Sequence, residues 1–423
     1  MSELLKRTDQ LWSGQASTAQ AEFHPFAGPR LLEELAPGVA FFKAFVNVTA
    51  VSTGEGLVLV DTGAYLPASH LLSFEAVRGW NRERLHTAVY THGHVDHAYG
   101  LPPFLAEAHG RNWAAPRIVG HENVLPRMLR YVRTEGYNSI INSRQFAVET
   151  KWPVEFQAPT DTYSDHLELS VGGTRFQLHH AKGETDDHTW VFLPETGTLC
   201  TGDLFIWAAP NAGNPQKVQR YAVEWAAALR AMAALDPKLL LPGHGLPIAG
   251  AARVQSALLD TAAYLESLVT QTLERLNAGQ TLYQILEEVR PPAALEAKPY
   301  LKPVYDEPEF IVRNLWRCFG GWHSGVPSEL KPAPRQALAR ELAGLSGGVE
   351  KLLERAGALL AAGDARLAAH LVDWAADAAP NSREVHAARS AVYAALTKGA
   401  SSTMSRGIYG AAARESQAKA GTQ

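Results

Sequence analysis

Three histidines and an aspartate crowd into the segment THGHVDH, residues 91–97. They are His92, His94, Asp96 and His97. Imidazole nitrogen and carboxylate oxygen are usual protein ligands for zinc, and a catalytic zinc site keeps one position open for water. The segment follows a short strand-like run, residues 86–90. We therefore expect a loop at the edge of a sheet, with His92 and His94 facing one way and Asp96 and His97 facing a second metal.

A histidine-rich surface loop without metal is the plainer interpretation of the same segment. The chain has 16 histidines and 43 acidic residues among 423. Chance alone would produce this pattern in roughly two chains per thousand of such composition, so a false match is rare. The metal-binding interpretation is therefore favoured.

Three later segments carry further carboxylates and imidazoles. They are KGETDDH at 182–188, TGD at 201–203 and PGHG at 242–245. Each follows a strand-like run and includes glycine, which lets the backbone approach closely. Donors gathered from several strand ends at one sheet edge can supply the six or seven ligands of a binuclear site. The sequence therefore predicts such a site.

The first 250 residues alternate strand-like and helix-like segments. Strands are expected at 46–51, 57–60, 86–90, 116–119, 174–179, 189–193, 198–201 and 238–241, and helices at 67–80, 103–109 and 218–234. Glycines in TGEG at 53–56 and PETG at 194–197 predict hairpin turns. Residues 121–165, rich in Arg, Tyr and Asn, are interpreted as a long insertion.

From residue 251 onward the hydrophobic period becomes helical, and 252–276 form one long amphipathic pattern. Prolines mark 326–335 as a linker. Helices predicted at 349–362 and 365–378 suit stacked helical hairpins resembling TPR repeats, although no clean 34-residue repeat is present. The expected domains are a catalytic domain at 1–255, a helical extension at 256–325 and an α-helical domain at 326–423.

The pattern HxHxDH, a later strand-end Gly-Asp and a final PGHG resemble the metallo-β-lactamase superfamily over roughly residues 25–250. The resemblance implies an α/β fold, namely an αβ/βα sandwich with its metal site between the edges of two sheets. It also implies a full ligand set for two zinc ions: His92, His94 and Glu184 for the first, Asp96, His97 and His244 for the second, and Asp203 bridging both. Asp61 matches a buried strand-end aspartate that supports the ligand loop; a simple turn aspartate is the alternative.

Glu184 stands where most members of this superfamily carry histidine, and this glutamate resembles the alkyl sulfatase branch, the type III sulfatases. Residues 305–332 resemble the segment of that branch that links its catalytic and dimerisation parts. Residues 363–400 resemble its helical dimerisation domain. The resemblance implies a homodimer that cleaves an alkyl sulfate ester with a metal-bound hydroxide, with Asp96 and Asp203 as catalytic residues.

Substrate contacts are expected from the insertion. Tyr137, Asn142 and Arg144 in GYNSIINSRQF could reach over the metals to an anionic or carbonyl group, and arginine suits a sulfate through paired hydrogen bonds. A packed structural loop is the alternative.

Several other reactive side chains are interpreted as structural. His188 is expected to support the site and not to bind metal, because Glu184 already takes that ligand place. His179 or His180 is the next ligand candidate. Cys200 lies in an apolar strand and is expected in the core, not as a nucleophile.

Composition narrows the partners and the location. The net charge is -4 and no basic run occurs, which disfavours nucleic acid and anionic membranes. Only two cysteines are present, so a disulfide scaffold is excluded. The polar start, MSELLKRTDQLWSG, has no apolar signal core, and no run approaches ~20 apolar residues. A cytoplasmic protein with a small-molecule ester substrate is expected.

The sequence thus predicts a binuclear hydrolase with two Zn²⁺ ions, other divalent metals being alternatives. A lactonase, thioesterase, β-lactamase-like amidase, phosphoester hydrolase or nuclease on the same metals remains open, because one fold hosts many chemistries. A helical-repeat interaction protein with a relic sandwich is the non-enzymatic alternative. Intact donors at seven positions argue against that relic.

Overall fold

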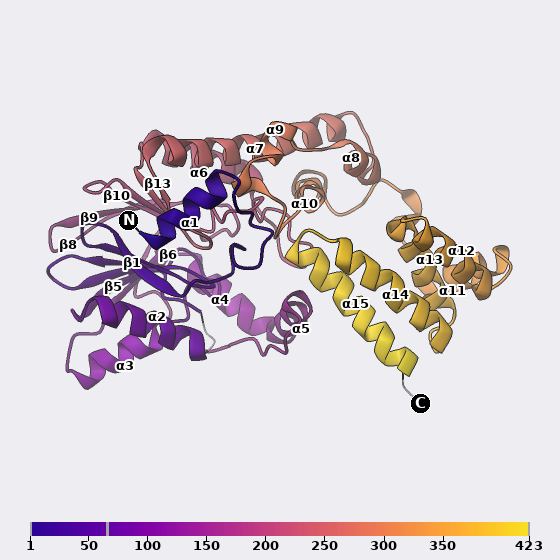
Figure 1. The fold of residues 1–423 in the computed structure, drawn as a ribbon, viewed down its shortest axis with the longest axis horizontal. Helices are drawn as coiled ribbons and strands as arrows, with labels where there is room; N and C mark the ends of the chain where they lie inside the picture. Colours follow the sequence, from indigo (N-terminus) through magenta and orange to yellow (C-terminus); the bar gives the residue numbers. More distant parts are fainter. Residues whose placement is uncertain (1, 65–66, 422–423) are drawn as a thin grey trace. The chain divides into compact units, whose positions relative to one another are not determined.

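The computed structural model describes residues 2–64 and 67–421. The chain forms two compact units. The first comprises Met1–Glu135 and Trp152–Gly321, and the second comprises Gly136–Lys151 and Trp322–Gln423. The first unit is an α/β sandwich extended by helices, and the second is helical (Figure 1). The expected fold class, a sandwich followed by an all-α domain, is confirmed.

The first sheet has seven strands among the described residues, in sequential order from β1 to β7. They are β1(Leu31–Ala36), β2(Val39–Lys43), β3(Val48–Ser52), β4(Leu57–Val60), β5(Leu85–Val89), β6(Arg117–His121) and β7(Asp161–Tyr163). Strands β1 to β4 pair antiparallel, whereas β4 to β7 pair parallel. The predicted TGEG hairpin joins β3 to β4, where the Thr53 hydroxyl donates to the Gly56 carbonyl at 2.7 Å.

The second sheet has six strands within the described ranges, in the order β13-β12-β11-β10-β9-β8. They are β8(His166–Val171), β9(Thr174–His180), β10(Thr189–Leu193), β11(Thr198–Gly202), β12(Leu239–Pro242) and β13(Ile248–Ala249). All neighbours are antiparallel except β11 and β12. The parallel pairing of β11 and β12 brings the ends of both strands, and the TGD and PGHG segments with them, to one edge.

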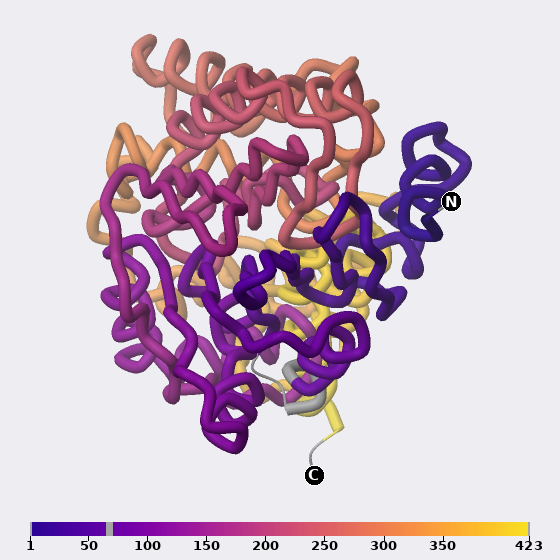
Figure 2. Tube along the Cα trace, turned by 90° about the vertical axis from the view of Figure 1, so that its left-hand side faces the viewer, coloured from indigo at the N-terminus to yellow at the C-terminus, as the bar shows by residue number. Residues whose placement is uncertain are grey.

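Helices cover the outer faces of both sheets. Against the first sheet lie α2(Pro67–Trp80) and α3(Pro102–Gly110), whose Val77 and Phe104 share a buried cluster with Leu59 of β4. Against the second lie α6(Ala222–Ala234) and α7(Ala251–Asn277), whose Trp225 and Leu258 are buried with its strands. Figures 1 and 2 show α6 and α7 side by side along this face.

The remaining elements of the first unit are all helical. They are α1(Glu3–Trp12), α4(Val124–Arg133), α8(Leu282–Glu288), α9(Ala293–Glu296), the short 3-10 turn Pro299–Leu301 and α10(Pro308–Gly320). Apolar side chains from the inner faces of both sheets meet between the layers, including Val60 of β4 and Val191 of β10. Each such fully buried side chain contributes about 1.5–3 kcal/mol through the area that it removes from water. This rigid frame holds the strand ends in place.

The second unit is built from helical hairpins. Its elements are α5(Glu135–Phe146), which starts at the boundary, the 3-10 turn Pro327–Glu329, α11(Arg335–Leu345), α12(Val349–Ala361), α13(Ala365–Ala378), α14(Arg383–Gly399) and α15(Thr403–Gly421). Asp364 begins α13 by accepting a hydrogen bond from the Leu367 amide at 3.1 Å, as a helix-capping aspartate does. The helices predicted at 349–362 and 365–378 are present within one residue.

Part of the expected insertion folds with the C-terminal helices. A Cβ atom at Gly407 of α15 would lie 2.5 Å from the Gln145 backbone of α5, and Arg144 pairs with Glu415 at 3.5 Å. The boundary between the units falls at 321/322. The predicted domain bounds at 255 and 325 did not place α5 with the C-terminal helices. The roles predicted for the three domains, catalytic, extension and dimerisation, stay predictions.

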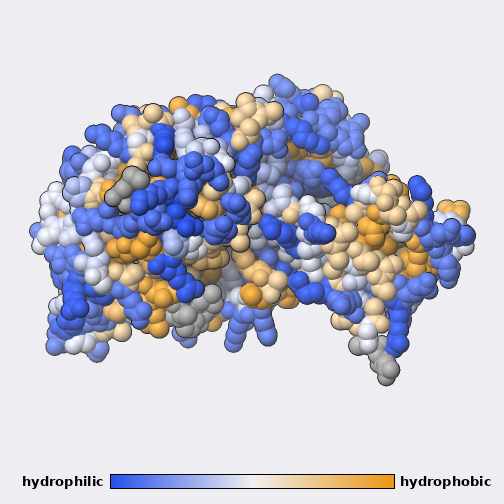
Figure 3. Space-filling model, viewed as in Figure 1, coloured by the Kyte–Doolittle hydropathy of each residue, from blue (hydrophilic) through white to orange (hydrophobic). Residues whose placement is uncertain are grey.

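Polar and apolar residues are interspersed on the face drawn in Figure 3. The most exposed large apolar side chains include Trp322 and Leu345 of the second unit, which are 70% and 85% exposed.

Among the helices that the structure describes, none is long and apolar enough to cross a membrane.

Candidate metal centre

All seven predicted ligand residues come together at strand ends. The loop after β5 carries four of them, Glu184 lies between β9 and β10, Asp203 follows β11 and His244 follows β12. They form two groups, His92, His94, Glu184 and Asp203 in one, and Asp96, His97 and His244 in the other. Within each group, one ligand atom per residue lies within 4.8 Å of the others. This grouping follows the two ligand sets that the resemblance implies.

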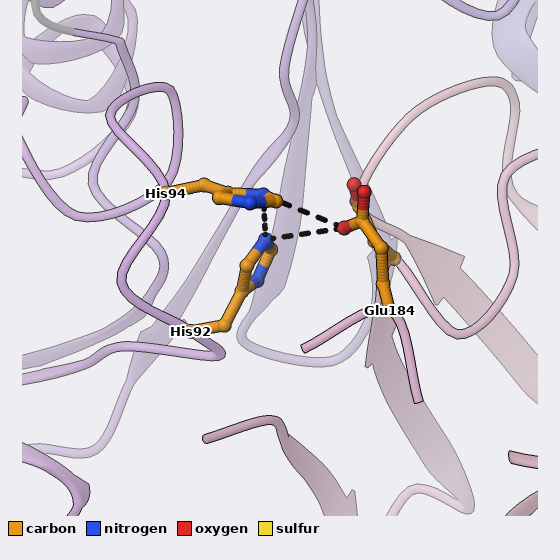
Figure 4. A group of neighbouring side chains, drawn as sticks. His92, His94 and Glu184 are labelled. Atoms are coloured by element: carbon orange, nitrogen blue, oxygen red, sulfur yellow. Dashed lines mark hydrogen bonds and ion pairs between the residues drawn. The ribbon is translucent and has the colours of Figure 1, made fainter. Parts of the chain in front are cut away.

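The first group converges on a single point (Figure 4). His92 Nε2 lies 2.7 Å from His94 Nδ1. Glu184 Oε2 lies 3.5 Å from the first nitrogen and 3.4 Å from the second. This oxygen is buried and has no hydrogen-bond partner within the described part of the chain. Two nitrogens and one oxygen therefore face the same small space.

In the second group, two histidine nitrogens lie near the same carboxylate oxygen of Asp96. Asp96 Oδ2 lies 3.7 Å from His97 Nε2 and 3.4 Å from His244 Nε2. Asp203 reaches this group too, because its Oδ1 lies 3.3 Å from His97 Nε2 and its Oδ2 lies 3.5 Å from His244 Nε2. Asp203 therefore stands between the two groups, where a shared ligand would stand.

Hydrogen bonds fix the rings of the second group. His97 Nδ1 donates to Asp61 at 2.7 Å, and Asp61 also accepts from the Thr91 amide and hydroxyl at 2.8 and 2.9 Å. His244 Nδ1 donates to the Phe45 carbonyl at 2.6 Å. A hydrogen on Nδ1 leaves the Nε2 lone pair free for a metal. Asp61 thus supports the ligand loop as the resemblance implies, and is not a simple turn residue.

A buried ion pair holds the backbone between His92 and His94. Asp187 Oδ2 accepts from the Gly93 amide at 2.7 Å, and its Oδ1 accepts from Arg127 Nε at 2.8 Å. Sequence reasoning missed both partners. The one signal for Asp187 was its place in GETDDH, and nothing local in the sequence indicates Arg127, which comes from α4.

Gly243 is required by close packing at the ligands. A Cβ atom there would lie 2.3 Å from Asp203 Oδ1 and 3.0 Å from His97 Cε1. No side chain fits without displacing a ligand, which explains the glycine before His244.

The charges of the cluster are strongly coupled. Burial opposes the charged form of His97, but Asp203, Asp61 and Asp96 outweigh it and raise its pKa well above the ordinary value. Burial likewise opposes a charge on His244, yet Asp203 and Asp96 raise its pKa to about 9. Burial would raise the pKa of Asp203, but His244 and His97 hold it well below its usual range. Without a metal, protonated His97 and His244 supply the positive charge that balances the carboxylates. A bound cation would supply that charge in place of the protons.

The donor set fits divalent metal ions. Buried His97 Nε2, Glu184 Oε2 and Asp203 Oδ1 have no hydrogen-bond partner in the described residues. Buried polar atoms are normally satisfied, so these atoms indicate a ligand. Mixed imidazole and carboxylate donors suit zinc and related metals.

The other predicted residues lie outside both groups. His188 Nε2 accepts from the Asp203 amide at 3.1 Å, and its ring stacks on His92 at 4.7 Å. His180 stacks on His121 at 3.6 Å, and His179 stacks on Trp190 at 4.1 Å.

Cys200 is buried in β11, and burial raises the pKa of its thiol to about 12. A thiol that stays protonated at neutral pH is a poor nucleophile.

Tyr137, Asn142 and Arg144 lie on α5. Asn142 is buried and donates to the Asn138 carbonyl at 2.8 Å, whereas Tyr137 is 56% exposed. Since α5 packs within the second unit, a substrate-binding role for these residues stays a prediction.

Two family models match this chain. The model described as metallo-beta-lactamase superfamily matches residues 43–244, and the model described as alkyl sulfatase dimerisation matches residues 281–419. Residues 43–244, just under half of the chain, are thus similar to the metallo-β-lactamase superfamily. Residues 281–419 match the dimerisation domain of the alkyl sulfatases, so the predicted resemblance to this superfamily and to its alkyl sulfatase branch is confirmed.

Curated relatives of this chain include several alkylsulfatases. It is 28% identical over 348 residues to a linear primary-alkylsulfatase of Pseudomonas sp., covering 77% of this chain and 65% of that protein. It is 24% identical over 397 residues to an (R)-specific secondary-alkylsulfatase of Pseudomonas sp., covering 87% and 59%. The chain therefore spans about three fifths of the length of these relatives.

A solved structure shares the fold. The stereoselective inverting sec-alkylsulfatase Pisa1 from Pseudomonas sp. superposes with a TM-score of 0.81 at 21% identity, covering 91% of this chain and 65% of that one. The likeness extends over both the sandwich and the helical domain.

Proposed function

We propose that this chain is a metal-dependent hydrolase of alkyl sulfate esters that uses two divalent metal ions, with zinc as the expected metal. The observation that carries the proposal is the position of Asp203, whose two oxygens lie near His97 and His244 while it also belongs to the group of His92, His94 and Glu184. A carboxylate shared between two sets of donors is what a binuclear site requires.

The proposed ligand sets divide the donors as follows: His92, His94 and Glu184 would hold one ion, Asp96, His97 and His244 the other, and Asp203 both. Metal ions bound there supply Lewis acidity, which makes water a nucleophile near neutral pH and polarises the substrate oxygen. No serine or cysteine nucleophile is needed.

Asp96 is the carboxylate that water reaches most readily. Its side chain is 24% exposed, against 8% for Asp203 and 3% for Glu184. Asp96 therefore accepts a hydrogen bond from the attacking water and orients it, while Asp203 keeps both donor sets in place. Addition of water splits the ester into an alcohol and hydrogen sulfate.

Lys217 supplies a positive charge for binding an anionic substrate. Its ammonium lies over the Trp152 ring, 5.2 Å from the centroid. Burial and the neighbouring Arg220 charge lower its pKa to about 8, against the pull of Glu184 and Asp96. Lys217 therefore keeps its positive charge at pH 7 beside the ligand cluster, where it offsets the charge of a sulfate group.

The proposed enzyme is a cytoplasmic homodimer. The dimerisation-domain match at 281–419 supports the oligomer, and the exposed Leu345 and Trp322 supply apolar surface for a partner. Light scattering of the full chain at micromolar concentration should give twice 45.9 kDa, and a monomer would contradict the proposal.

Turnover of a substrate panel tests the proposed reaction. The purified full chain, loaded with zinc, is incubated with decyl sulfate, a lactone, a thioester and a chromogenic cephalosporin. Ion chromatography should detect sulfate from decyl sulfate, and Asp96→Asn should remove that release. Turnover of a lactone or thioester without sulfate release would overturn the sulfatase assignment and leave a different hydrolase on the same metals.

A further inference from the structure

The two carboxylate oxygens of Glu184 have different surroundings. Oε2 faces His92 and His94, as Figure 4 shows. Oε1 accepts a hydrogen bond from Asn211 Nδ2 and pairs with Arg220 Nη1 at 2.9 Å. Hydrogen bonds and an ion pair therefore satisfy Oε1, while Oε2 points toward the two histidines. A carboxylate held in this way offers a single donor atom in a fixed direction.

Arg220 binds Glu184 through two contacts. Besides the carboxylate, its Nη1 donates to the Glu184 backbone carbonyl. Both side chains are buried, at 2% exposure for Arg220 and 3% for Glu184. A buried carboxylate is costly unless a partner balances its charge, and a planar guanidinium is suited to that role. The Glu184–Arg220 pair therefore presents an oxygen donor with no net formal charge, as a neutral imidazole presents a nitrogen donor.

A separate part of the chain fixes the position of Arg220. Asn314 of α10 brackets its backbone, because Asn314 Nδ2 donates to the Arg220 carbonyl at 2.9 Å and Asn314 Oδ1 accepts from the Arg220 amide at 3.3 Å. These paired contacts hold the end of the loop before α6 through the backbone of Arg220, without involving Glu184.

The start of this loop, which carries Asn211, is held as firmly. Buried Asp306 accepts from the Gly213 amide at 2.6 Å and the Asn214 amide at 3.1 Å. A Cβ atom at Gly213 would lie 2.4 Å from the Phe310 backbone, so this approach to α10 needs glycine. Asn211 and Arg220 therefore approach Glu184 from a loop that α10 and the residue Asp306 just before it hold in place.

We propose that Arg220 and Asn211 are positioning residues that make Glu184 a charge-compensated metal ligand. This inference rests on the proposed metal centre and adds to it two residues that touch no metal. Arg220 balances the negative charge of Glu184, and Asn211 with Arg220 keeps Oε2 turned toward His92 and His94. If Glu184 were replaced by a neutral ligand, Arg220 would lose this role.

A double-mutant cycle on metal affinity tests the inference. Arg220→Met and Glu184→His are made singly and together, and zinc affinity is measured by competition with a chromogenic chelator. Arg220→Met alone should weaken one of the two sites by about 10–100-fold, the usual effect of losing a partner of a metal ligand. In the Glu184→His background, the same change should weaken it by less than about threefold, because no charge is left to balance.

Equal losses in both backgrounds, or no loss in the Glu184 background, would overturn the inference and leave Arg220 as a structural residue only. If the unaltered protein bound no zinc, the proposed metal centre itself would fail, so the two failures are distinguishable. Arg230→Met is the matched control, since Arg230 pairs with Glu266 at the surface and should leave zinc affinity unchanged.

Asn211→Ala provides a second line of test that keeps every charge. It removes one hydrogen bond to Oε1 and should weaken the same site by about tenfold. Circular dichroism verifies that each variant is folded. If Arg220→Met does not fold, an Asn211→Ala protein with unchanged zinc affinity would by itself overturn the inference.

Discussion

The carboxylate of Asp61 lies 2.7 Å from Nδ1 of His97, and this contact directs the opposite ring nitrogen toward Asp203, 3.3 Å away. Asp61 directly follows β4 and His97 lies in the loop after β5, so the parallel pairing of these two strands brings them together. Asp61, which is not itself a proposed ligand, thus determines how the ring of His97 is oriented.

Removal of Asp61 should therefore weaken metal binding. Asp61→Ala leaves His97 without its acceptor and frees the Thr91 amide and hydroxyl, so we expect one site to lose affinity by about 10–100-fold. Zinc titration measures the loss. Asp161→Ala, which breaks an exposed pair with Arg117 and a hydrogen bond from Thr160, should have no effect. Full affinity in Asp61→Ala would mean that His97 is oriented by other contacts.

Lys217 should act on substrate binding and not on metal content. Lys217→Met removes a cation near an anionic substrate, and we expect the KM for decyl sulfate to rise about tenfold, which corresponds to ~1.4 kcal/mol. Lys217→Arg should retain most of the affinity. Lys302→Met serves as control, because Lys302 donates to the Glu296 carbonyl at an exposed position. An unchanged KM in Lys217→Met would remove Lys217 from the substrate site.

The buried pair of Arg127 and Asp187 should matter for stability in an asymmetric way. Asp187→Ala leaves Arg127 buried with Asp186 as its remaining carboxylate partner, so we expect a loss of about 3–5 kcal/mol in the free energy of unfolding. Changing both residues to Met and Leu should cost less than Asp187→Ala alone. Urea unfolding measures these differences, and a double variant less stable than the single variant would contradict this reasoning.

Lys43 should give a distinct dependence of stability on pH. Its ammonium is buried, donates to the carbonyls of Pro25, Ala27 and Ala44, and has a pKa lowered to about 7 by burial and by Arg7. Between about pH 7 and the ordinary lysine value, the unfolded chain binds a proton that the folded chain does not. Stability therefore rises with pH across this window and is lowest below pH 7.

Lys43→Met isolates this contribution. The difference in unfolding free energy between the unaltered protein and the variant should move in favour of the unaltered protein by up to about 1.4 kcal/mol per pH unit from pH 7 to 9. Urea unfolding at pH 6, 7, 8 and 9 checks it. A difference that stays constant over this range would show that Lys43 titrates as an exposed lysine does.

Local signals in the sequence predicted the cluster of candidate ligands and much of the fold. THGHVDH carries four donors in one loop, and TGD and PGHG follow strongly apolar strands, so the residues near the site could be selected before their geometry was known. The strands at 57–60 and 189–193 and the helix at 67–80 match the observed bounds, because clear breakers flank each run.

What was missed depends on contacts between distant segments. Asn211 lies in a stretch without any motif, and it meets Glu184 only because Asp306 and Asn314 hold that loop. Edge strand β1 does not alternate between buried and exposed positions, so its periodicity was not distinctive. The return of α5 to α15 rests on Gly407 packing against Gln145, a contact that no local pattern predicts.

Metal analysis coupled to sulfate release tests the central claim most directly. The purified protein should contain two divalent metal ions per chain. Stepwise metal removal with a chelator should abolish sulfate release from decyl sulfate in proportion, and adding zinc back should restore it. His94→Ala should lose metal and activity together. A metal-free preparation that releases sulfate at the full rate would contradict the account.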